Sequence, residues 1–268
     1  MTTASLIPRL RLLLLLLLLA TAAPVAADDD GDAGWDVYLL IGQSNMAGRG
    51  PLEASDTAEV IPGVWLLNAE GKPEPAVAPL NRYSTVRKDL PLQEVGPGVS
   101  FGAEMHRRTG RRILIVQNAR GGSGIRSWQP GDRAGYLDSA LVRTRQALRY
   151  GPLRGICWHQ GETDTPQRDP ARYATLFDTL AAALRTALGD VPIVVGEVGR
   201  WEWADADDIA LFNDSTLAEA CRRVPRVGKV SSLGLGPRWP EKPKDPHFSR
   251  AAALELGRRY AEAMMRLY

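Results

Sequence analysis

Polar side chains that could hydrolyse an ester follow several apolar runs of the sequence. Ser44 stands in the turn Gly42-Gln43-Ser44, which follows an apolar run and opens an expected helix. A serine at such a turn exposes its hydroxyl beside free backbone N–H groups, as a nucleophile requires. Serines at this place more often cap the helix, so position alone leaves both roles open. Ser44 is therefore a candidate nucleophile, and Asn45 beside it is a candidate substrate contact.

Two further polar segments follow later apolar runs. Gly121 and Gly122 lie in a glycine-rich loop whose backbone N–H groups can approach a ligand closely, as an oxyanion or phosphate site requires. The segment from 158 to 164 (WHQGETD) is the densest polar cluster of the chain. In it, Gln160 could donate to a developing negative charge, and Glu162 could orient a histidine.

Only one of the three histidines stands where a catalytic base is expected. His106 lies among charged residues of an expected helix, and His159 belongs to the polar cluster. His247 lies in the loop between the last expected strand and the last expected helix. A serine hydrolase needs a base whose second ring nitrogen is held by a carboxylate. Asp245, two residues before His247, and Glu162, across the site, are the candidates.

Alternating elements must position these residues. Continuous apolar runs are typical of strands covered on both faces, as in a parallel sheet. Such runs are followed by amphipathic segments, which predicts an α/β fold: a single doubly wound domain with a five-stranded parallel sheet flanked by helices, a three-layer sandwich. The expected strands are 36–41, 112–117, 155–158, 191–195 and 227–232, and the expected helices are 101–109, 136–150, 172–188, 209–224 and 250–267.

The position of these residues along the predicted fold indicates where a site would form. Ligands bind at the carboxyl ends of the strands in open parallel sheets. The candidate residues all follow expected strands, so we expect them to converge at one edge. Residues 51–98, which are rich in Pro, Gly and charge, are expected to form a long loop region that borders this edge.

The first residues are typical of an export signal. Arg9 and Arg11 precede the apolar run 12–19, and the Ala-rich segment 20–27 ends in a small-residue cleavage pattern. A membrane anchor is the alternative, but the apolar stretch is shorter than the roughly 20 residues that a spanning helix needs. We therefore expect a signal peptide over 1–27, an esterase-type domain over 28–268, a secreted or periplasmic location, and no membrane span after cleavage.

The charge and the cysteines exclude other classes. The 268 residues hold 33 Lys and Arg against 31 Asp and Glu, and loss of Arg9 and Arg11 would make these numbers equal. A nucleic-acid binder needs a basic face, so no nucleic-acid partner is expected. Cys157 and Cys221 lie in apolar surroundings and are expected to be free thiols rather than parts of a disulfide framework.

Two other functions account for the candidate residues less well. A flavodoxin-like nucleotide-binding module would use the loop 42–50 but leaves Gln160, Glu162 and His247 unexplained. A metal hydrolase could use His159 and Asp164 together with Glu162 and His247, but these residues have no recognised ligand spacing. Neither a metal nor an organic cofactor is expected.

Four blocks together carry a resemblance to a known family. They resemble the SGNH hydrolase superfamily and, more narrowly, its sialate O-acetylesterase and acetylxylan esterase group (carbohydrate esterase family 6). The blocks occur in family order over nearly all of the chain from residue 36 onward. They are IGQSNMAG at 41–48, Gly121-Gly122 with Ile125 and Trp128, WHQGE at 158–162, and DPHFS at 245–249.

The resemblance implies roles for these residues. Ser44 would be the nucleophile and His247 the base. The backbone N–H groups of Ser44 and Gly122, with the side chain of Gln160, would hold the oxyanion. The implied activity is removal of O-acetyl groups from a carbohydrate such as acetylxylan, sialic acid or a related glycan. The implied partner is thus an acetylated carbohydrate.

The sequence departs from the family pattern at the catalytic acid. The usual aspartate stands three residues before the histidine, where this chain has Lys244. Asp245 is only two residues before His247, so either a shorter loop still lets it reach or Glu162 supplies the carboxylate. We favour Asp245. The altered spacing also leaves an alternative function, that of a non-catalytic carbohydrate-binding relative.

Tryptophans after the fourth expected strand are candidates for binding the sugar. Trp201 and Trp203 follow residues 191–195, at the edge where the site is expected, and an indole ring can stack on a sugar. Tryptophans more commonly pack inside the protein, and Trp128 is at least as well explained in that way. The sequence does not indicate which glycan is bound, nor the oligomeric state.

Overall fold

The computed structural model describes residues 34–268, and the expected signal peptide over 1–27 lies outside the described residues. Within that range the strands are β1 (Trp35–Gly42), β2 (Val64–Leu67), β3 (Pro73–Pro75), β4 (Arg112–Gln117), β5 (Leu153–His159), β6 (Ile193–Gly196) and β7 (Val227–Val230). The α-helices are α1 (Ser44–Ala47), α2 (Ala54–Ala58), α3 (Gly98–Thr109), α4 (Tyr136–Ala147), α5 (Pro170–Leu188), α6 (Ala206–Ala210), α7 (Leu217–Arg223) and α8 (Arg250–Met265). Short 3₁₀ turns lie at Leu80–Tyr83, Leu90–Leu92, Ile125–Trp128 and Thr165–Gln167, and a π-helical segment joins α6 to α7 at Leu211–Thr216.

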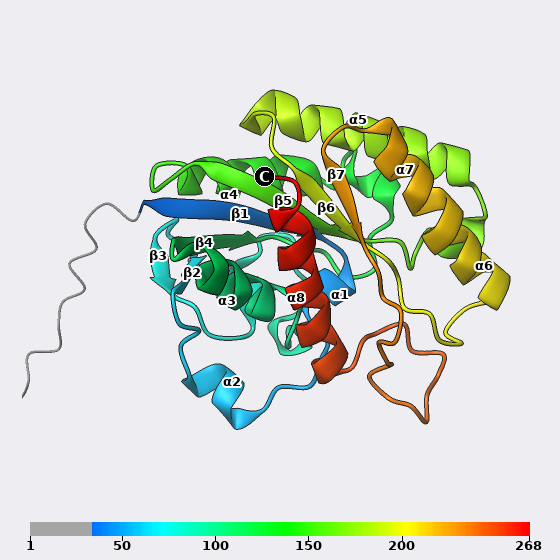
Figure 1. Cartoon of the computed structure of the whole chain (residues 1–268), viewed down its shortest axis with the longest axis horizontal. Coiled ribbons are helices and arrows are strands. Elements are labelled where there is room, and N and C mark those ends of the chain that lie inside the picture. The colour runs from blue at the N-terminus through cyan, green and yellow to red at the C-terminus, as the bar shows by residue number, and fades with distance from the viewer. Residues whose placement is uncertain (1–33) are drawn as a thin grey trace, which may run out of the picture. The chain divides into compact units, whose positions relative to one another are not determined.

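The strands form one sheet in the order β3-β2-β4-β1-β5-β6-β7 (Figure 1). All neighbouring strands are parallel except β2 and β3, which pair antiparallel. The sheet confirms the predicted doubly wound α/β domain and adds two strands to the five that were predicted. Both added strands lie within 51–98, which the sequence indicated as loop. They are short, and β3 begins and ends in proline, a residue that sequence patterns assign to edges and turns.

The alternation of β1 divides the interior into two layers. Val37, Leu39 and Ile41 pack with residues of α4, α5 and α7, whereas Tyr38 and Leu40 pack with residues of α3 and α8. Successive side chains of a strand point to opposite faces, so one continuous apolar strand supplies both layers. Figure 1 shows α3 and α8 side by side on one face of the sheet.

The strands β4 and β5 lie on opposite sides of β1 in the sheet, and this order determines where a site can form. The strand β4 pairs with one edge of β1, and the next strand, β5, pairs with the other. The loops that follow β4 and β5 therefore diverge on either side of the carboxyl end of β1, where Ser44 begins α1. Such a point, where the strand order reverses, is where ligands bind in open α/β sheets.

The two cysteines lie in different layers. Cys157 packs in the layer of α3 and α8, and Cys221 packs against the layer of α4 and α5. Both are free thiols, as the sequence indicated. Among residues 34–268, the structure has no helix that is long and apolar enough to span a membrane.

Leu39 offers a test of this arrangement because it is fully buried on the central strand. We expect Leu39→Ala to lower the free energy of unfolding by about 2–5 kcal/mol, since it leaves a cavity in the core. Leu233→Ala is the control, because Leu233 is 70% exposed and should change it by no more than about 0.5 kcal/mol. Equilibrium unfolding in denaturant measures both, and equal losses would contradict the assigned core.

Candidate active site

A sharp turn between β1 and α1 positions Ser44. Gly42 has φ +130°, and a Cβ on it would lie 2.0 Å from the carbonyl oxygen of His159. Only glycine allows this close approach of the end of β1 to the end of β5. The Gln43 N–H then donates to that same carbonyl at 2.8 Å. The turn therefore holds Ser44 against the carboxyl end of β5, with its side chain aimed at His247.

Ser44, His247 and Asp245 form a connected chain of side chains. The Nε2 atom of His247 lies 3.0 Å from the Ser44 Oγ, and its Nδ1 atom lies 2.5 Å from Oδ1 of Asp245. The Asp245 Oδ1 also accepts the backbone N–H of His247 at 3.0 Å. The two-residue spacing between the acid and the histidine therefore reaches the ring.

The loop that carries His247 is held at both ends. Its backbone pairs with residues 236–238, where the Arg238 N–H donates to the His247 carbonyl at 2.6 Å and Pro237 forms a bridge with Phe248. On the other side, the Trp201 indole N–H donates to the Asp245 carbonyl at 2.8 Å, and its ring packs edge-on against Phe248.

The side chain of Asn45 contacts the loop that carries His247. Its side-chain oxygen accepts the Phe248 N–H at 3.2 Å, and its Nδ2 donates to the Pro246 carbonyl at 3.0 Å. Nδ2 also donates to Glu162 Oε1. Asn45 is 4% exposed, so its amide is committed to the backbone on both sides of His247. These contacts position the histidine, and a substrate contact of Asn45 stays a prediction.

Glu162 lies behind Asn45 and does not reach the His247 ring. Its Oε1 atom accepts a hydrogen bond from Asn45 Nδ2 and lies 3.4 Å from Nε2 of His159. The Glu162 side chain is 3% exposed. Burial by itself would raise the pKa of this carboxyl, but the bonds from His159 and Asn45 hold that pKa below its usual value. Glu162 is thus an ionised carboxylate that anchors Asn45, and Asp245 is the acid in contact with His247.

The side chain of Gln160 has internal hydrogen-bond partners. Its Nε2 lies within hydrogen-bonding distance of Gln43 Oε1 at 3.1 Å, Ser123 O at 3.1 Å and Asp164 Oδ2 at 2.5 Å. The residue is completely buried, and Tyr173 donates to its Oε1 at 3.1 Å. An amide has two N–H donors, and three internal acceptors surround them. In this arrangement the Gln160 amide supports the glycine loop through the Ser123 carbonyl, and its role as an oxyanion donor stays a prediction.

The glycine loop presents backbone donors beside Ser44. A Cβ on Gly121 would lie 3.6 Å from the Cβ of Ser44, so this loop passes directly next to the nucleophile candidate. Within residues 34–268, the backbone N–H groups of Ser44 and Gly122 donate to no protein acceptor. They remain the candidates for an oxyanion hole.

Gln43 is a site residue that the sequence reasoning missed. Its Oε1 accepts from Gln160 Nε2 at 3.1 Å and lies 3.4 Å from the backbone N–H groups of both Gly161 and Thr163. This one side chain ties the turn after β1 to the loop after β5. Its place next to Ser44 in the block at 41–48 was the only signal for it.

The two candidate tryptophans have internal partners. Trp201 supports the Asp245 loop, as described above. The Trp203 indole N–H donates to the Gly199 carbonyl at 2.8 Å, and Trp203 packs against the layer of α5 and α7. A sugar-stacking role for Trp201 and Trp203 stays a prediction, whereas Trp128 is fully buried and packs against Trp158.

Burial sets the protonation state of the candidate base. It lowers the pKa of His247, and the charge of Arg49 lowers it further, whereas the neighbouring Asp245 and Glu162 carboxylates raise it. The net direction is below the ordinary histidine value. A neutral imidazole whose Nδ1–H is held by Asp245 presents its Nε2 lone pair to the Ser44 hydroxyl, which is the arrangement of a general base.

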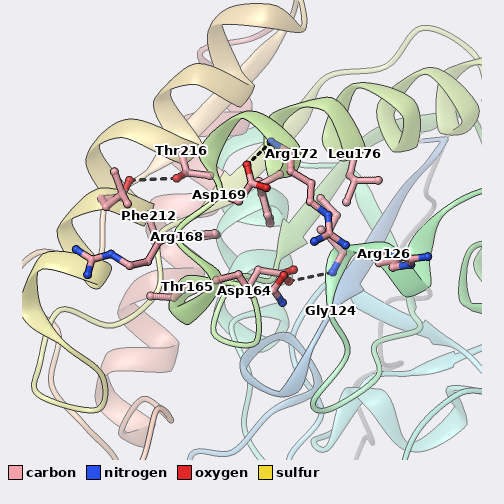
Figure 2. A pocket seen from close by; sticks show the side chains of 14 residues that line it. Gly124, Arg126, Asp164, Thr165, Arg168, Asp169, Arg172, Leu176, Phe212 and Thr216 are labelled. Atoms are coloured by element: carbon pink, nitrogen blue, oxygen red, sulfur yellow. Dashed lines mark hydrogen bonds between the residues drawn. The ribbon is translucent and has the colours of Figure 1, made fainter.

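A separate cavity lies beyond Asp164. Figure 2 shows that residues from 124–126, 164–176 and 211–216 surround it, with Asp164 turned toward the segment at Gly124. Asp164 accepts from the Ile125 N–H at 3.0 Å and from Gln160, and burial raises its pKa. None of Ser44, Asp245 and His247 lines this cavity. In the described part of the chain, no group of three or more His, Cys, Asp or Glu side chains could hold a metal ion.

A family model and a curated relative match this chain. The family model described as "Carbohydrate esterase, sialic acid-specific acetylesterase" matches residues 34–266. A probable carbohydrate esterase of Arabidopsis thaliana is 26% identical over 254 residues, which is 85% of this chain and 90% of that protein.

Solved structures share the fold. The Arabidopsis thaliana protein has a TM-score of 0.70 at 23% identity, over 87% of this chain and 98% of the other. NanS has a TM-score of 0.66 at 20% identity, over 87% and 97%. A carbohydrate acetylesterase from Xanthomonas citri has a TM-score of 0.62 at 20% identity, over 87% of this chain and 56% of its own. Because the family model spans nearly the whole described domain, the chain belongs to the sialic acid-specific acetylesterase family of carbohydrate esterases.

Proposed function

We propose that this protein removes O-acetyl groups from a carbohydrate through an acyl-enzyme formed on Ser44. The observation that carries the proposal is the contact chain from Ser44 Oγ to His247 Nε2 at 3.0 Å and from His247 Nδ1 to Asp245 at 2.5 Å. A nucleophile, a base and an orienting acid within hydrogen-bonding reach define a triad by geometry.

The reaction proceeds in two steps of acyl transfer. His247 Nε2 takes the hydroxyl proton as Ser44 Oγ bonds to the acetyl carbonyl carbon, and the backbone N–H groups of Ser44 and Gly122 stabilise the resulting oxyanion. The tetrahedral intermediate then expels the sugar oxygen, which receives the proton from His247. Water, deprotonated by His247, attacks the acetyl-enzyme in the same way, and acetate leaves as the Ser44 hydroxyl is restored.

Asp245 and Asn45 have different tasks in this scheme. Asp245 holds the Nδ1–H of His247 and stabilises the imidazolium that forms during each step. Asn45 takes no part in proton transfer. It fixes the backbone at Pro246 and Phe248, and Glu162 fixes Asn45 in turn. A side chain that restrains the base maintains the reaction rate, because a small misplacement of a catalytic group lowers that rate strongly.

Three finer points complete the proposal. The blocks at 41–48 and 158–162 support placement in carbohydrate esterase family 6. The amino-terminal pattern at 1–27 supports export, so the enzyme would act on its substrate in the periplasm or outside the cell. The non-catalytic alternative depended on the shortened spacing before His247, and the direct contact of Asp245 with the ring favours the enzyme.

A fluorophosphonate that reacts with activated serines tests the nucleophile. We expect a single adduct in the intact mass of the wild-type protein and none in Ser44→Ala, because among the serine hydroxyls of residues 34–268 only that of Ser44 contacts a histidine ring. His247→Ala should slow labelling strongly, since the hydroxyl then lacks its base. A folded wild-type protein that forms no adduct would overturn the proposal.

Substitution of the two carboxylates distinguishes the acid from the anchor. Asp245→Ala should lower kcat/KM for an acetyl ester by roughly 10²–10⁴, as loss of a triad acid does. Glu162→Gln should cost clearly less, because Glu162 does not touch the His247 ring. Glu241→Ala, an exposed carboxylate in the same loop, is the control. A near-normal rate in Asp245→Ala with a collapse in Glu162→Gln would refute the assignment of Asp245.

The pH profile tests the state of His247. The base works only when unprotonated, and its pKa is lowered by burial. We therefore expect kcat/KM to fall on the acid side with a midpoint below pH 6.5, the ordinary histidine value, and to stay flat through neutral pH. Because the Asp245 charge raises this pKa, Asp245→Asn should move the midpoint lower still. A midpoint above pH 7 in the wild type would contradict the structure.

A further inference from the structure

Arg49 is a buried cation that uses few of its donors. It is 8% exposed, and its Nη1 donates to the Gly48 carbonyl at 2.5 Å. Among residues 34–268, this carbonyl is the one acceptor that the guanidinium contacts. Nη2 and Nε have no protein acceptor, yet neither nitrogen is sealed from solvent. Buried charges are normally paired, because removing a charge from water costs several kcal/mol. The unused donors of Arg49 therefore need another explanation.

The turn after α1 determines where Arg49 lies. Gly48 has φ +101°, and a Cβ on it would lie 2.1 Å from the Glu94 carbonyl oxygen. Only glycine allows this close approach, which ends the helix that Ser44 begins. The next two N–H groups, those of Arg49 and Gly50, donate to the carbonyl at position 95 at 3.1 and 2.9 Å. The backbone that carries the guanidinium is therefore fixed near the start of α1.

The free edge of the guanidinium adjoins the nucleophile. A Cβ on Gly121 would lie 2.7 Å from Arg49 Nη2 and 3.6 Å from the Ser44 Cβ. Both side chains thus border one glycine, and no side chain at position 121 separates them. Besides burial, the charge of Arg49 lowers the pKa of His247, so the guanidinium also lies within electrostatic reach of the base.

The candidate oxyanion site has room for a third donor. A tetrahedral oxyanion has three lone pairs, and the backbone N–H groups of Ser44 and Gly122 would engage two of them. The Gln160 amide faces three internal acceptors and is completely buried. Gly121, which borders Arg49 Nη2, directly precedes Gly122. Arg49 therefore brings an unused, charged donor to the loop that would hold the oxyanion.

Lys88 is a second cation near this loop, but it is less well held. A Cβ on Gly122 would lie 3.3 Å from Lys88 Nζ. Lys88 is exposed, and its ammonium stands on a flexible stem that is strongly hydrated in water. Stabilisation of a developing charge is strongest from donors that are fixed in place and shielded from water. The buried Arg49 meets these conditions, and the exposed Lys88 does not.

We propose that Arg49 is a catalytic residue whose Nη2–H donates a hydrogen bond to the oxyanion on the acetyl carbonyl. As Ser44 Oγ bonds to the carbonyl carbon, the π electron pair of the C=O bond moves to its oxygen, which accepts from Nη2. The proton stays on Arg49, because a guanidinium is not deprotonated in proteins. When the sugar oxygen leaves, the electron pair re-forms the C=O bond. This inference rests on the proposed function, because it needs the acyl transfer at Ser44.

An uncharged ester tests this role, because it offers Arg49 no charge before the reaction begins. With 4-nitrophenyl acetate, Arg49→Ala should lower kcat by roughly 10²–10³, as loss of an oxyanion donor does, and change KM by less than about threefold. Both acylation and deacylation pass through an oxyanion, so kcat falls whichever step limits it. The rates are compared on the pH plateau, because loss of Arg49 raises the pKa of His247. A raised KM with an unchanged kcat would overturn the proposal.

Chemical rescue distinguishes a charged donor from a structural support. Free guanidinium ion, at concentrations too low to unfold the protein, should raise kcat of Arg49→Ala by roughly tenfold, because it restores a charge-assisted donor. Urea has a similar planar shape without the charge and should have little effect. Equal rescue by both would show that Arg49 only fills space. If Arg49→Ala does not fold, Arg49→Lys should exceed Arg49→Gln in kcat by roughly tenfold, and equal rates would overturn the proposal.

Arg143→Ala is the matched control for removal of a buried arginine. Arg143 is 3% exposed and donates to the carbonyls of Leu67 and Asn68 at the end of β2. This variant should keep the wild-type kcat and should not respond to guanidinium. Lys88→Ala should also keep kcat within about threefold, since an exposed charge contributes little. A collapse of kcat in Lys88→Ala, with a near-normal rate in Arg49→Ala, would assign the donor to Lys88 and refute Arg49.

Fluorophosphonate labelling separates this inference from the proposed function. If the wild type labels Ser44 and Arg49→Ala keeps its kcat, the role of Arg49 is refuted and the esterase proposal stands. If a folded wild-type protein does not label Ser44, both proposals fail.

Discussion

The geometry of the site depends on the Asn45 side chain, because it joins the segment that carries Ser44 to the loop that carries His247. Ser44 and His247 are 203 residues apart in the sequence, and the Asn45 amide bonds to the backbone on both sides of His247. Two hydrogen bonds therefore hold the loop, one on each side of His247. They leave the histidine side chain little freedom to move away from Ser44. The distance between Ser44 and His247 is thus fixed by the residue next to the nucleophile.

The orientation of Asn45 is in turn fixed by a buried polar network. Tyr260 donates its hydroxyl proton to the Trp158 carbonyl at 2.8 Å, so the His159 Nδ1–H is the donor in the 3.1 Å contact with that hydroxyl. The other ring nitrogen lies 3.4 Å from Glu162 Oε1. The polar block after β5 therefore places the buried Glu162 carboxylate against Asn45. The hydrogen bonds of such a buried group favour one arrangement, because each broken bond leaves a costly unpaired group.

The sequence predicts the fold and the meeting of Ser44, His247 and Asp245 well, but it predicts the contacts behind these residues poorly. Long apolar runs predict β1, β4 and β5 because strands buried on both faces need them, whereas β2 and β3, at one end of the sheet, are only four and three residues long and too short for such a signal. Ser44 and His247 follow from their places at strand ends. The roles of Gln160 and Asn45 do not, because an amide that donates to substrate and one that donates to the protein have the same sequence. Only the partners of each N–H, which tertiary packing decides, tell them apart.

The shortened spacing between acid and base has a local physical explanation. Asp245 accepts the backbone N–H of the residue two positions later, which is the turn that aspartate side chains form readily. That residue is His247, so one oxygen of Asp245 meets both its backbone N–H and its ring Nδ1. Pro246 between them restricts the backbone φ and leaves no competing N–H donor. The carboxylate is therefore held by the same residue whose ring it orients, and a second intervening residue is unnecessary.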